Sequence, residues 1–334
     1  MRDMINLQEL QELCALPGIS GREEAVRDWL IARLPDGVPY EIDPLGNLIV
    51  NPANAKVLLC AHMDEVGFLV THITGDGFLK FAHVGGISRA AYLGRRVFVG
   101  ETQLPGVVGV TPIHLLDGDA RGTIPKQEAL YIDIGAKDRA QAEEHVSPGD
   151  YVTFAPEFAA FGDDQICAKA IDDRTGCLIL LELLRAHPDM CAVFTTREEV
   201  GGAVASAARA PHPEYAIVLE TTTAADLPGV SGAERVCALG AGAVVPFMDG
   251  GTVYPFDLYQ RVMELAKHAG IPAQTKTLIA GGNDARTLTG AGVPSIAISV
   301  PCRNLHSPSV VMQTSDAQSV YQLAELTWKE LTAR

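Results

Sequence analysis

Four short, almost continuous apolar runs mark the chain and indicate its fold class. They cover residues 57–61, 191–194, 215–219 and 295–300. Runs of this length are typical of strands buried on both faces, as in a mostly parallel sheet flanked by helices, although a buried helix can give the same pattern. Together with the helical segments described next, they favour an α/β fold.

Three other segments repeat apolar residues at helical spacing. The first follows Ser20 and Glu23, which have the S-x-x-E spacing of a capping box, so we expect a helix to begin there. The second lies between Pro255 and Gly270, residue types that favour the start and the end of a helix. The third is at the C-terminus. Their apolar stripes are Val26, Trp29, Leu30 and Leu34; Leu258, Val262, Leu265, Ala266 and Ala269; and Val320, Leu323, Ala324, Trp328 and Leu331.

The middle of the chain has a different pattern. Residues 66–160 are dense in glycine and β-branched residues, and only residues 138–144 suggest a helix. Segments 96–99 and 107–110 look like short strands closed by turns. We therefore predict a small inserted β-rich domain over residues 66–160, with residues 1–65 and 161–334 forming one α/β domain around a mixed, mostly parallel sheet.

Composition narrows the possible partners and compartments. The 334 residues carry a formal net charge of −15, which opposes binding to nucleic acid or to anionic membranes. The N-terminus lacks the pattern of a secretion signal, and no apolar run reaches the ~18 residues of a membrane span. The seven cysteines form no C-x-x-C pair, so we expect buried thiols in a reducing compartment. These features predict a cytoplasmic protein.

Polar residues able to bind metal follow the apolar runs. In open α/β sheets, ligands bind beyond the carboxyl ends of the strands, so such side chains should converge there. His62 follows the first run, Glu198 and Glu199 the second, Glu220 the third, and His306 the fourth after a short gap; Asp172 and Asp173 occupy a further corner between strand and helix.

Each of these residues alone also has an ordinary structural interpretation. His62 and Asp64 fit an exposed pair, Asp172 fits a turn or a helix cap, and the adjacent glutamates fit a solvated turn. Taken together, two histidines and three carboxylates without cysteine are the ligand types of a hydrolytic two-metal site. We expect Asp172 to bridge the ions, one of the two glutamates to bind metal, and the other to take a proton from the activated water.

Four motifs then occur in order along the chain. Together they closely resemble the glutamyl aminopeptidase family, also called tetrahedral aminopeptidases, and the likeness extends from residues 17–21 and 45–48 to the C-terminal helix. The motifs are Ala-His-Met-Asp-Glu-Val-Gly-Phe at 61–68, Asp-Asp-Arg-Thr-Gly at 172–176, Thr-Arg-Glu-Glu-Val-Gly at 196–201 and Leu-His-Ser-Pro at 305–308.

The resemblance implies a role for each candidate residue. His62 and Glu220 would hold one ion, Glu199 and His306 the other, and Asp172 would bridge the two. Glu198 would be the general base, Asp64 would orient His62, and the peptide bond between Asp172 and Asp173 would be cis. The fold would be that of zinc peptidases, with zinc as the expected metal and cobalt or manganese as alternatives.

The resemblance also implies an assembly and an activity. The inserted domain would serve dimerisation, and dimers of this family build hollow tetrahedral dodecamers. The activity would be removal of N-terminal residues from short peptides through a water activated by two metal ions. The alternatives are hydrolysis of another amide, such as an acylated amino acid or a C-terminal peptide bond, and a catalytically silent, metal-stabilised assembly.

Three positions depart from the family pattern. Glu220 stands where the family often has Asp, and Asn304 stands where an aromatic residue is common. Asn283 replaces the threonine of the usual Gly-Gly-Thr-Asp loop. These changes concern one ligand and the surroundings of the substrate, so they bear on specificity more than on the chemistry.

Overall fold

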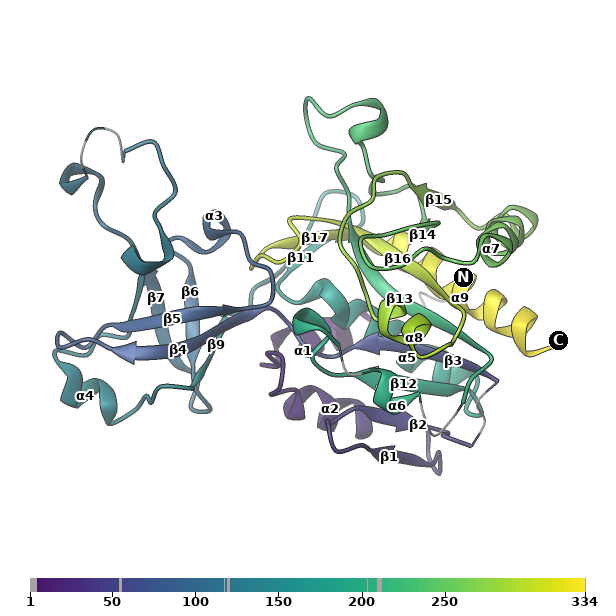
Figure 1. The fold of residues 1–334 in the computed structure, drawn as a ribbon, viewed down its shortest axis with the longest axis horizontal. Helices are drawn as coiled ribbons and strands as arrows, with labels where there is room; N and C mark the ends of the chain where they lie inside the picture. Colours follow the sequence, from purple (N-terminus) through teal and green to yellow (C-terminus); the bar gives the residue numbers. More distant parts are fainter. Residues whose placement is uncertain are drawn as a thin grey trace.

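The computed structural model describes residues 5–53, 56–116, 118, 121–202, 204–208 and 212–333. The chain folds into two parts that lie side by side, a larger α/β part and a smaller β-barrel (Figure 1). Each part has its own hydrophobic core. This architecture confirms the predicted fold class, a mixed and mostly parallel sheet flanked by helices with a small β-rich domain.

The large sheet contains all four apolar runs as strands, and these four strands are parallel neighbours. Their residues are almost entirely buried, because helices cover both faces of the sheet. The sheet order is β1 (Tyr40–Ile42), β2 (Leu48–Val50), β12 (Cys191–Thr195), β3 (Val57–His62), β13 (Tyr215–Thr223), β16 (Ser295–Arg303), β17 (Val310–Gln313), β11 (Gln165–Ala168) and β10 (Phe158–Phe161), with β14 (Ala243–Pro246) pairing with β16 and with β15 (Ala273–Lys276).

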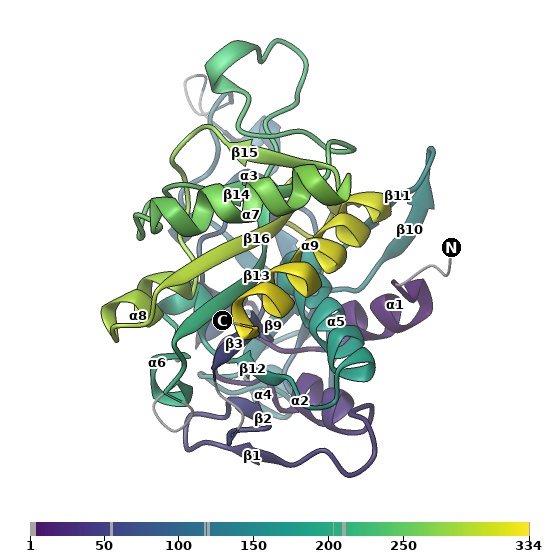
Figure 2. The same ribbon diagram turned by 90° about the vertical axis from the view of Figure 1, so that its right-hand side faces the viewer.

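Helices lie on both faces of this sheet. Figure 2 shows α5 and α9 crossing in front of the central strands, where they pack on β3, β13 and β16. The smaller helices α6 and α8 contact β12, β13 and β16. The helices of this part are α1 (Leu7–Ala15), α2 (Glu24–Ile31), α5 (Ile171–Ala186), α6 (Val204–Ala207), α7 (Phe256–Ala269), α8 (Ala285–Gly290) and α9 (Thr314–Thr332), with 3-10 turns η4 (Glu198–Val200) and η5 (Gly232–Glu234).

The three predicted helices are present as α2, α7 and α9, but the predicted capping box is wrong. Helix α2 begins after Glu23, and no side chain caps its N-terminus. The Ser20 hydroxyl instead donates to Asp64, which is 44 residues away in the sequence. Helix α7 ends at Gly270, whose φ of 66° is in the left-handed region that glycine tolerates.

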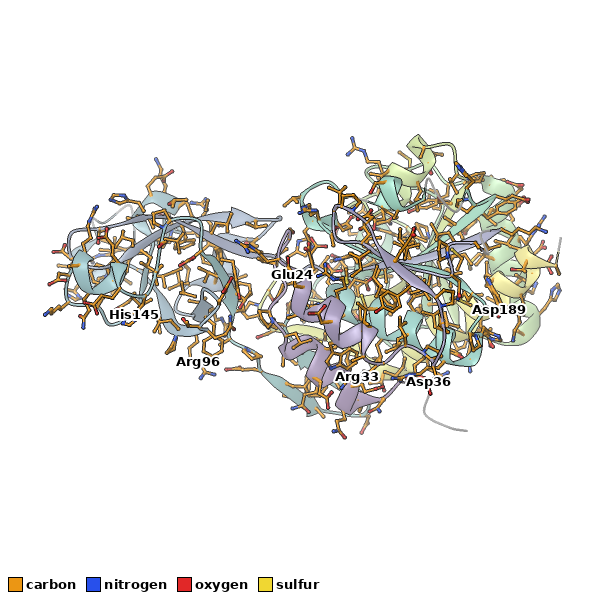
Figure 3. The ribbon with its side chains drawn as sticks, turned by 90° about the horizontal axis from the view of Figure 1, so that it is seen from below. Glu24, Arg33, Asp36, Arg96, His145 and Asp189 are labelled. Atoms are coloured by element: carbon orange, nitrogen blue, oxygen red, sulfur yellow. The ribbon has the colours of Figure 1, made fainter. Side chains whose placement is uncertain are left out.

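The smaller part is a closed antiparallel barrel formed by the middle of the chain. Its strand order is β4 (Gly67–Ile73), β5 (Leu79–Val84), β8 (Tyr131–Asp133), β7 (Leu104–Gly109), β6 (Arg96–Val99) and β9 (Tyr151–Phe154). Short helices α3 (Arg89–Tyr92) and α4 (Arg139–Glu143) and 3-10 turns η1 (Ile113–Leu115) and η3 (Gln127–Ala129) accompany it. In Figure 3, Arg96 and His145 lie in the barrel, whereas Arg33, Asp36 and Asp189 lie in the α/β part.

Six of the seven cysteines are buried, Cys167 is partly exposed, and none forms a disulfide. They behave as the small buried hydrophobic residues that the sequence predicts. Within the described residues, no helix is both long and apolar enough to cross a bilayer.

Candidate metal centre

The candidate metal ligands meet at the carboxyl edge of the large sheet. His62 is the last residue of β3, and Glu220 lies within β13, which continues three residues beyond it. The parallel register pairs Val218 with Cys60, so two residues further along Glu220 comes level with His62. Glu199 lies in η4 after β12, Asp172 lies at the start of α5, and His306 lies between β16 and β17.

Asp172 sits between the two histidines. Its Oδ1 is 3.3 Å from His62 Nε2, and its Oδ2 is 3.2 Å from His306 Nε2. Each carboxylate oxygen therefore faces a different imidazole. A carboxylate that bridges two ions needs this arrangement, because each of its oxygens must reach one ion.

A second carboxylate faces each imidazole. Glu220 Oε1 is 3.5 Å from His62 Nε2, and Glu199 Oε2 is 3.4 Å from His306 Nε2. The five side chains thus form two groups of three that share Asp172. All five expected ligands are brought together by the fold, and nitrogen and oxygen donors of this kind suit zinc, cobalt or manganese.

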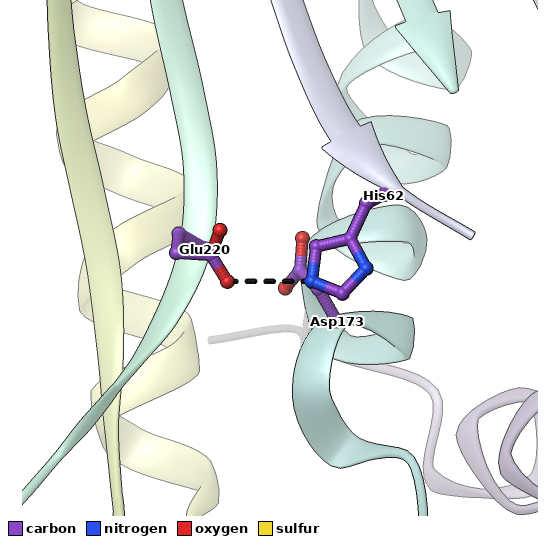
Figure 4. Close-up of side chains that lie close together, drawn as sticks. All are labelled: His62, Asp173 and Glu220. Carbon is purple, nitrogen blue, oxygen red and sulfur yellow. Dashed lines mark ion pairs between the residues drawn. The ribbon is translucent and has the colours of Figure 1, made fainter. Parts of the chain in front are cut away.

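Asp173 also lies beside this cluster. Figure 4 shows His62, Asp173 and Glu220 together, and their ligand atoms lie within 4.8 Å of one another. Asp173 Oδ1, however, accepts a hydrogen bond from the Gly176 backbone N–H at 3.0 Å. A Cβ at position 176 would lie 2.3 Å from Asp173 Oδ2, so this carboxyl is packed against the first regular turn of α5. The peptide bond between Asp172 and Asp173 is cis, as the family resemblance predicts.

Asp64 makes more contacts than the sequence suggests. Its side chain is fully buried, and its Oδ1 is 3.4 Å from His62 Nδ1, while its backbone carbonyl oxygen is 3.1 Å from the same nitrogen. Oδ1 also accepts from the Glu198 N–H at 3.0 Å, and Oδ2 accepts from the Glu199 N–H at 3.2 Å. One carboxylate therefore holds both a candidate ligand and the backbone of the glutamate pair.

Burial and mutual repulsion perturb the pKa values of these groups. Burial raises the pKa of Glu199 to about 8 and that of Glu220 to about 7. Burial alone would lower the pKa of His306, but the hydrogen bond to Asp172 and the negative charges of Glu199 and Asp172 together outweigh it and raise that pKa to about 9. Burial opposes ionisation of Asp172 too, yet hydrogen bonds from both histidines hold its pKa well below the usual value. Bound protons thus offset part of the negative charge of these buried carboxylates. Divalent cations can take the place of the protons, because they bind the same nitrogen and oxygen atoms.

A pH dependence of stability follows from these shifts. We expect the Tm of protein kept metal-free with a chelator to fall as pH rises from about 6 to about 9. An unfolded chain loses the His306 proton near pH 6.5, whereas the folded chain keeps it up to about pH 9. Glu199 and Glu220 act in the same direction, because the folded state again binds more protons than the unfolded state.

Thermal melts at a series of pH values measure this effect. Zinc-loaded protein is the matched control, and its Tm should vary less with pH, because metal binding replaces the protons. A Tm of the metal-free protein that increases across the same window would contradict the charge balance described here.

A cavity of about 760 Å³ opens beside the candidate ligands. Glu198 lies in its wall, and burial raises the pKa of this carboxyl to about 10. Asn283 also lines the cavity and donates to Tyr254 Oη at 3.0 Å, whereas Asn304 is not among the lining residues. Further lining residues with ionisable side chains are Asp249, Lys276, Asp284 and Arg286. Asp284 belongs to the loop that the family resemblance places near the substrate, whereas the other three were not placed at the site from the sequence. Asp249 follows the buried strand β14, which is the one sequence signal that could have found it.

Comparisons with known proteins agree with this geometry. The family model described as M42 glutamyl aminopeptidase matches residues 46–323. The lysyl aminopeptidase of Pyrococcus furiosus is 30% identical, over 98% of both sequences. The glutamyl aminopeptidase of Lactococcus lactis subsp. cremoris is 30% identical, over 92% of this chain and 91% of its own length.

Comparison with a solved structure supports the same family relationship. The TET1 peptidase of Pyrococcus horikoshii, described as assembling into a tetrahedron or a large octahedral shell, superposes with a TM-score of 0.86. It is 32% identical, with 96% of this chain and 98% of that chain covered. The matched motifs, the fold and the shared sequence lead to one conclusion, that this chain belongs to the M42 glutamyl aminopeptidase family and has the aminopeptidase, and hence hydrolase, function of that family.

Proposed function

We propose that this protein is a dinuclear, metal-dependent aminopeptidase that removes N-terminal residues from short peptides. The observation that carries the proposal is the position of Asp172, whose two oxygens face two different imidazoles at 3.3 and 3.2 Å. His62 and Glu220 would hold one ion, His306 and Glu199 the other, and Asp172 both. When bound, the two ions would polarise the scissile carbonyl and lower the pKa of the attacking water.

Glu198 is the proposed general base. Its carboxylate would take one proton from the attacking water and then give a proton to the nitrogen of the leaving amine as the peptide bond breaks. The raised pKa of Glu198, caused first by burial, suits a group that must hold a proton between these two steps. Divalent cations nearby would lower that pKa and so favour the carboxylate form that begins the reaction.

The wall of the cavity carries both acidic and basic side chains. Besides the candidate ligands, it includes the carboxyls of Glu198, Asp249 and Asp284 and the cations Lys276 and Arg286. A wall carboxylate attracts an N-terminal ammonium group, which a blocked N-terminus lacks. This is compatible with an aminopeptidase, and substrates with free and blocked N-termini separate it from a hydrolase of acylated amino acids that uses the same ligands.

Activity on a substrate panel tests the proposal. The purified protein, loaded in turn with zinc, cobalt or manganese, is assayed with aminoacyl-anilides of acidic, basic and apolar residues, with free short peptides, and with N-blocked peptides. Hydrolysis of the free substrates alone is the expected result. Hydrolysis of the blocked substrates alone would favour the other amide hydrolases, and two bound ions without any hydrolysis would indicate a metal-stabilised assembly protein.

We further propose a homo-oligomer built through the inserted segment 66–160. This segment carries exposed apolar side chains, among them Ile113 at 65%, Leu115 at 67% and Ile124 at 49% exposure. Exposed apolar groups of this kind are typical of interaction surfaces. Dimers are the expected unit, a tetrahedral dodecamer is the larger alternative, and cytoplasmic residence stays a prediction from the sequence.

A further inference from the structure

The loop between α1 and α2 has no part in the proposed chemistry, yet it lies against the turn that carries Glu198. The Ser20 hydroxyl donates to Asp64 Oδ2 at 2.6 Å, a shorter hydrogen bond than either backbone N–H makes with this carboxylate. The same Oδ2 accepts from the Glu199 backbone N–H at 3.2 Å. Ser20 therefore restrains the carboxylate that holds the backbone of the glutamate pair.

Glu23 makes a second contact with the same turn. Its side chain is buried, and Oε1 accepts from the Gly21 N–H at 2.7 Å and from the Arg197 N–H at 3.1 Å. Arg197 directly precedes Glu198 and has a φ of 59°, in the left-handed region that side chains other than glycine disfavour. Such a conformation persists only where its surroundings enforce it, and the Glu23 carboxylate is one of its hydrogen-bond partners.

The loop is itself anchored to the strand end that carries the first histidine. The Glu65 N–H donates to Gly18 O at 2.8 Å, and Ile19 forms a parallel bridge with Glu65. The buried Arg174 guanidinium donates to the carbonyl of Met63, between His62 and Asp64, and to the carbonyl of Leu13 in α1. The loop, the His62 strand end and the Arg197 turn are thus joined in one hydrogen-bonded unit.

We propose that Ser20 and Glu23 are positioning residues that keep the Glu198 carboxylate aimed into the cavity, Ser20 through Asp64 and Glu23 through the Arg197 backbone. The proposal rests on the proposed role of Glu198 as the base. Neither residue touches the cavity, since neither is among its lining residues in the described part of the chain. Their effect should therefore fall on turnover and leave substrate binding almost unchanged.

Two substitutions of Glu23 separate its role as an acceptor from its charge. Glu23→Gln keeps a carbonyl oxygen for the Gly21 and Arg197 N–H groups, and its kcat should stay within about threefold of wild type. Glu23→Ala removes that acceptor and should lower kcat by about 10- to 100-fold, because displacement of a catalytic group by about 1 Å has an effect of that size. KM and the metal content, measured by elemental analysis, should be unchanged in both variants.

Ser20 allows the same comparison. Ser20→Thr keeps the hydroxyl that donates to Asp64, whereas Ser20→Ala removes it. The alanine variant should lower kcat with little change in KM, and the threonine variant should restore most of it. In a Glu198→Gln background Glu23→Ala should lower kcat no further, since residues that act through one group are not additive. Ser20→Ala can still lower it there, because Asp64 also contacts His62 and the Glu199 N–H.

Hydrogen exchange supplies a test that does not depend on activity. Peptides covering residues 195–202 should exchange faster in Glu23→Ala and Ser20→Ala than in wild type, while peptides from β13 and β16 should be unchanged. Unchanged exchange and kcat in both alanine variants, or equal losses in Glu23→Ala and Glu23→Gln, would overturn the proposal. An inactive wild type would instead refute the proposed function, and the exchange rates would still show whether the loop holds the turn.

Discussion

Replacing Glu198 with Gln is expected to lower kcat by about 10²- to 10⁴-fold while the protein keeps its metal ions. Gln has the size of Glu, so the fold of the turn and the Glu198 N–H bond to Asp64 should persist. Its amide cannot accept the proton of the attacking water. The loss therefore falls on the chemical step, and KM for a peptide substrate should change little. Steady-state kinetics with metal analysis of the same sample measures both properties.

The neighbouring Glu199 provides the matched control. Its Oε2 lies 3.4 Å from His306 Nε2, so Glu199→Gln should weaken metal binding as well as activity. The two glutamates are adjacent in sequence and chemically identical, and only their positions differ. Full activity of Glu198→Gln, or loss of metal from that variant instead of from Glu199→Gln, would defeat the assignment of the base.

The four parallel strands of the large sheet could be predicted because burial alone determines them. A strand covered on both faces must be apolar at almost every position, and the run at 57–61 is such a strand. Helix α1 was not predicted. Its buried residues Leu10, Leu13 and Cys14 repeat at helical spacing, and the Asn6 side chain caps its N-terminus, so the sequence does carry the signals of a short helix there.

Long-range contacts explain the other differences between sequence and structure. Ser20 and Glu23 have the spacing of a capping box, yet both side chains bond to the Asp64 and Arg197 region instead of capping α2. A local pattern cannot reveal a partner that is 44 or 174 residues away. For the same reason the sequence predicted only one of the contacts that Asp64 makes.

The site was largely predictable for a topological reason. His62, Glu199 and Glu220 lie at or near the carboxyl ends of parallel strands, and these ends meet at one edge of the sheet. His306 follows the fourth strand after a short gap, so its position also indicated this edge, and the family resemblance then assigned it to one of the two ions. The Asp249 and Lys276 side chains of the cavity wall come from the β14 and β15 region, and no periodic pattern assigns such residues to a site.

The second large effect is expected from Asp172→Asn. An amide presents one oxygen and one NH₂ group, so the substituted side chain can face an ion on one side only. The imidazoles of His62 and His306 lie on opposite oxygens of Asp172, and one of the two groups of ligands would therefore lose its shared donor. We expect at most one ion per chain after gel filtration and a loss of kcat of at least about 10³-fold, since loss of one ion removes half of the two-metal arrangement.

Asp173→Asn is the control that separates the two adjacent aspartates. Asp173 also lies close to His62 and Glu220, and burial raises its pKa well above the usual value, so a neutral amide resembles its protonated form. The oxygen of the substituted amide would still accept the Gly176 N–H, as Asp173 Oδ1 does. Asp173→Asn should thus keep two ions per chain, whereas Asp172→Asn should not. The reverse result would make Asp173 the shared ligand, and the hydrogen bond to Gly176 would then have to break when metal binds.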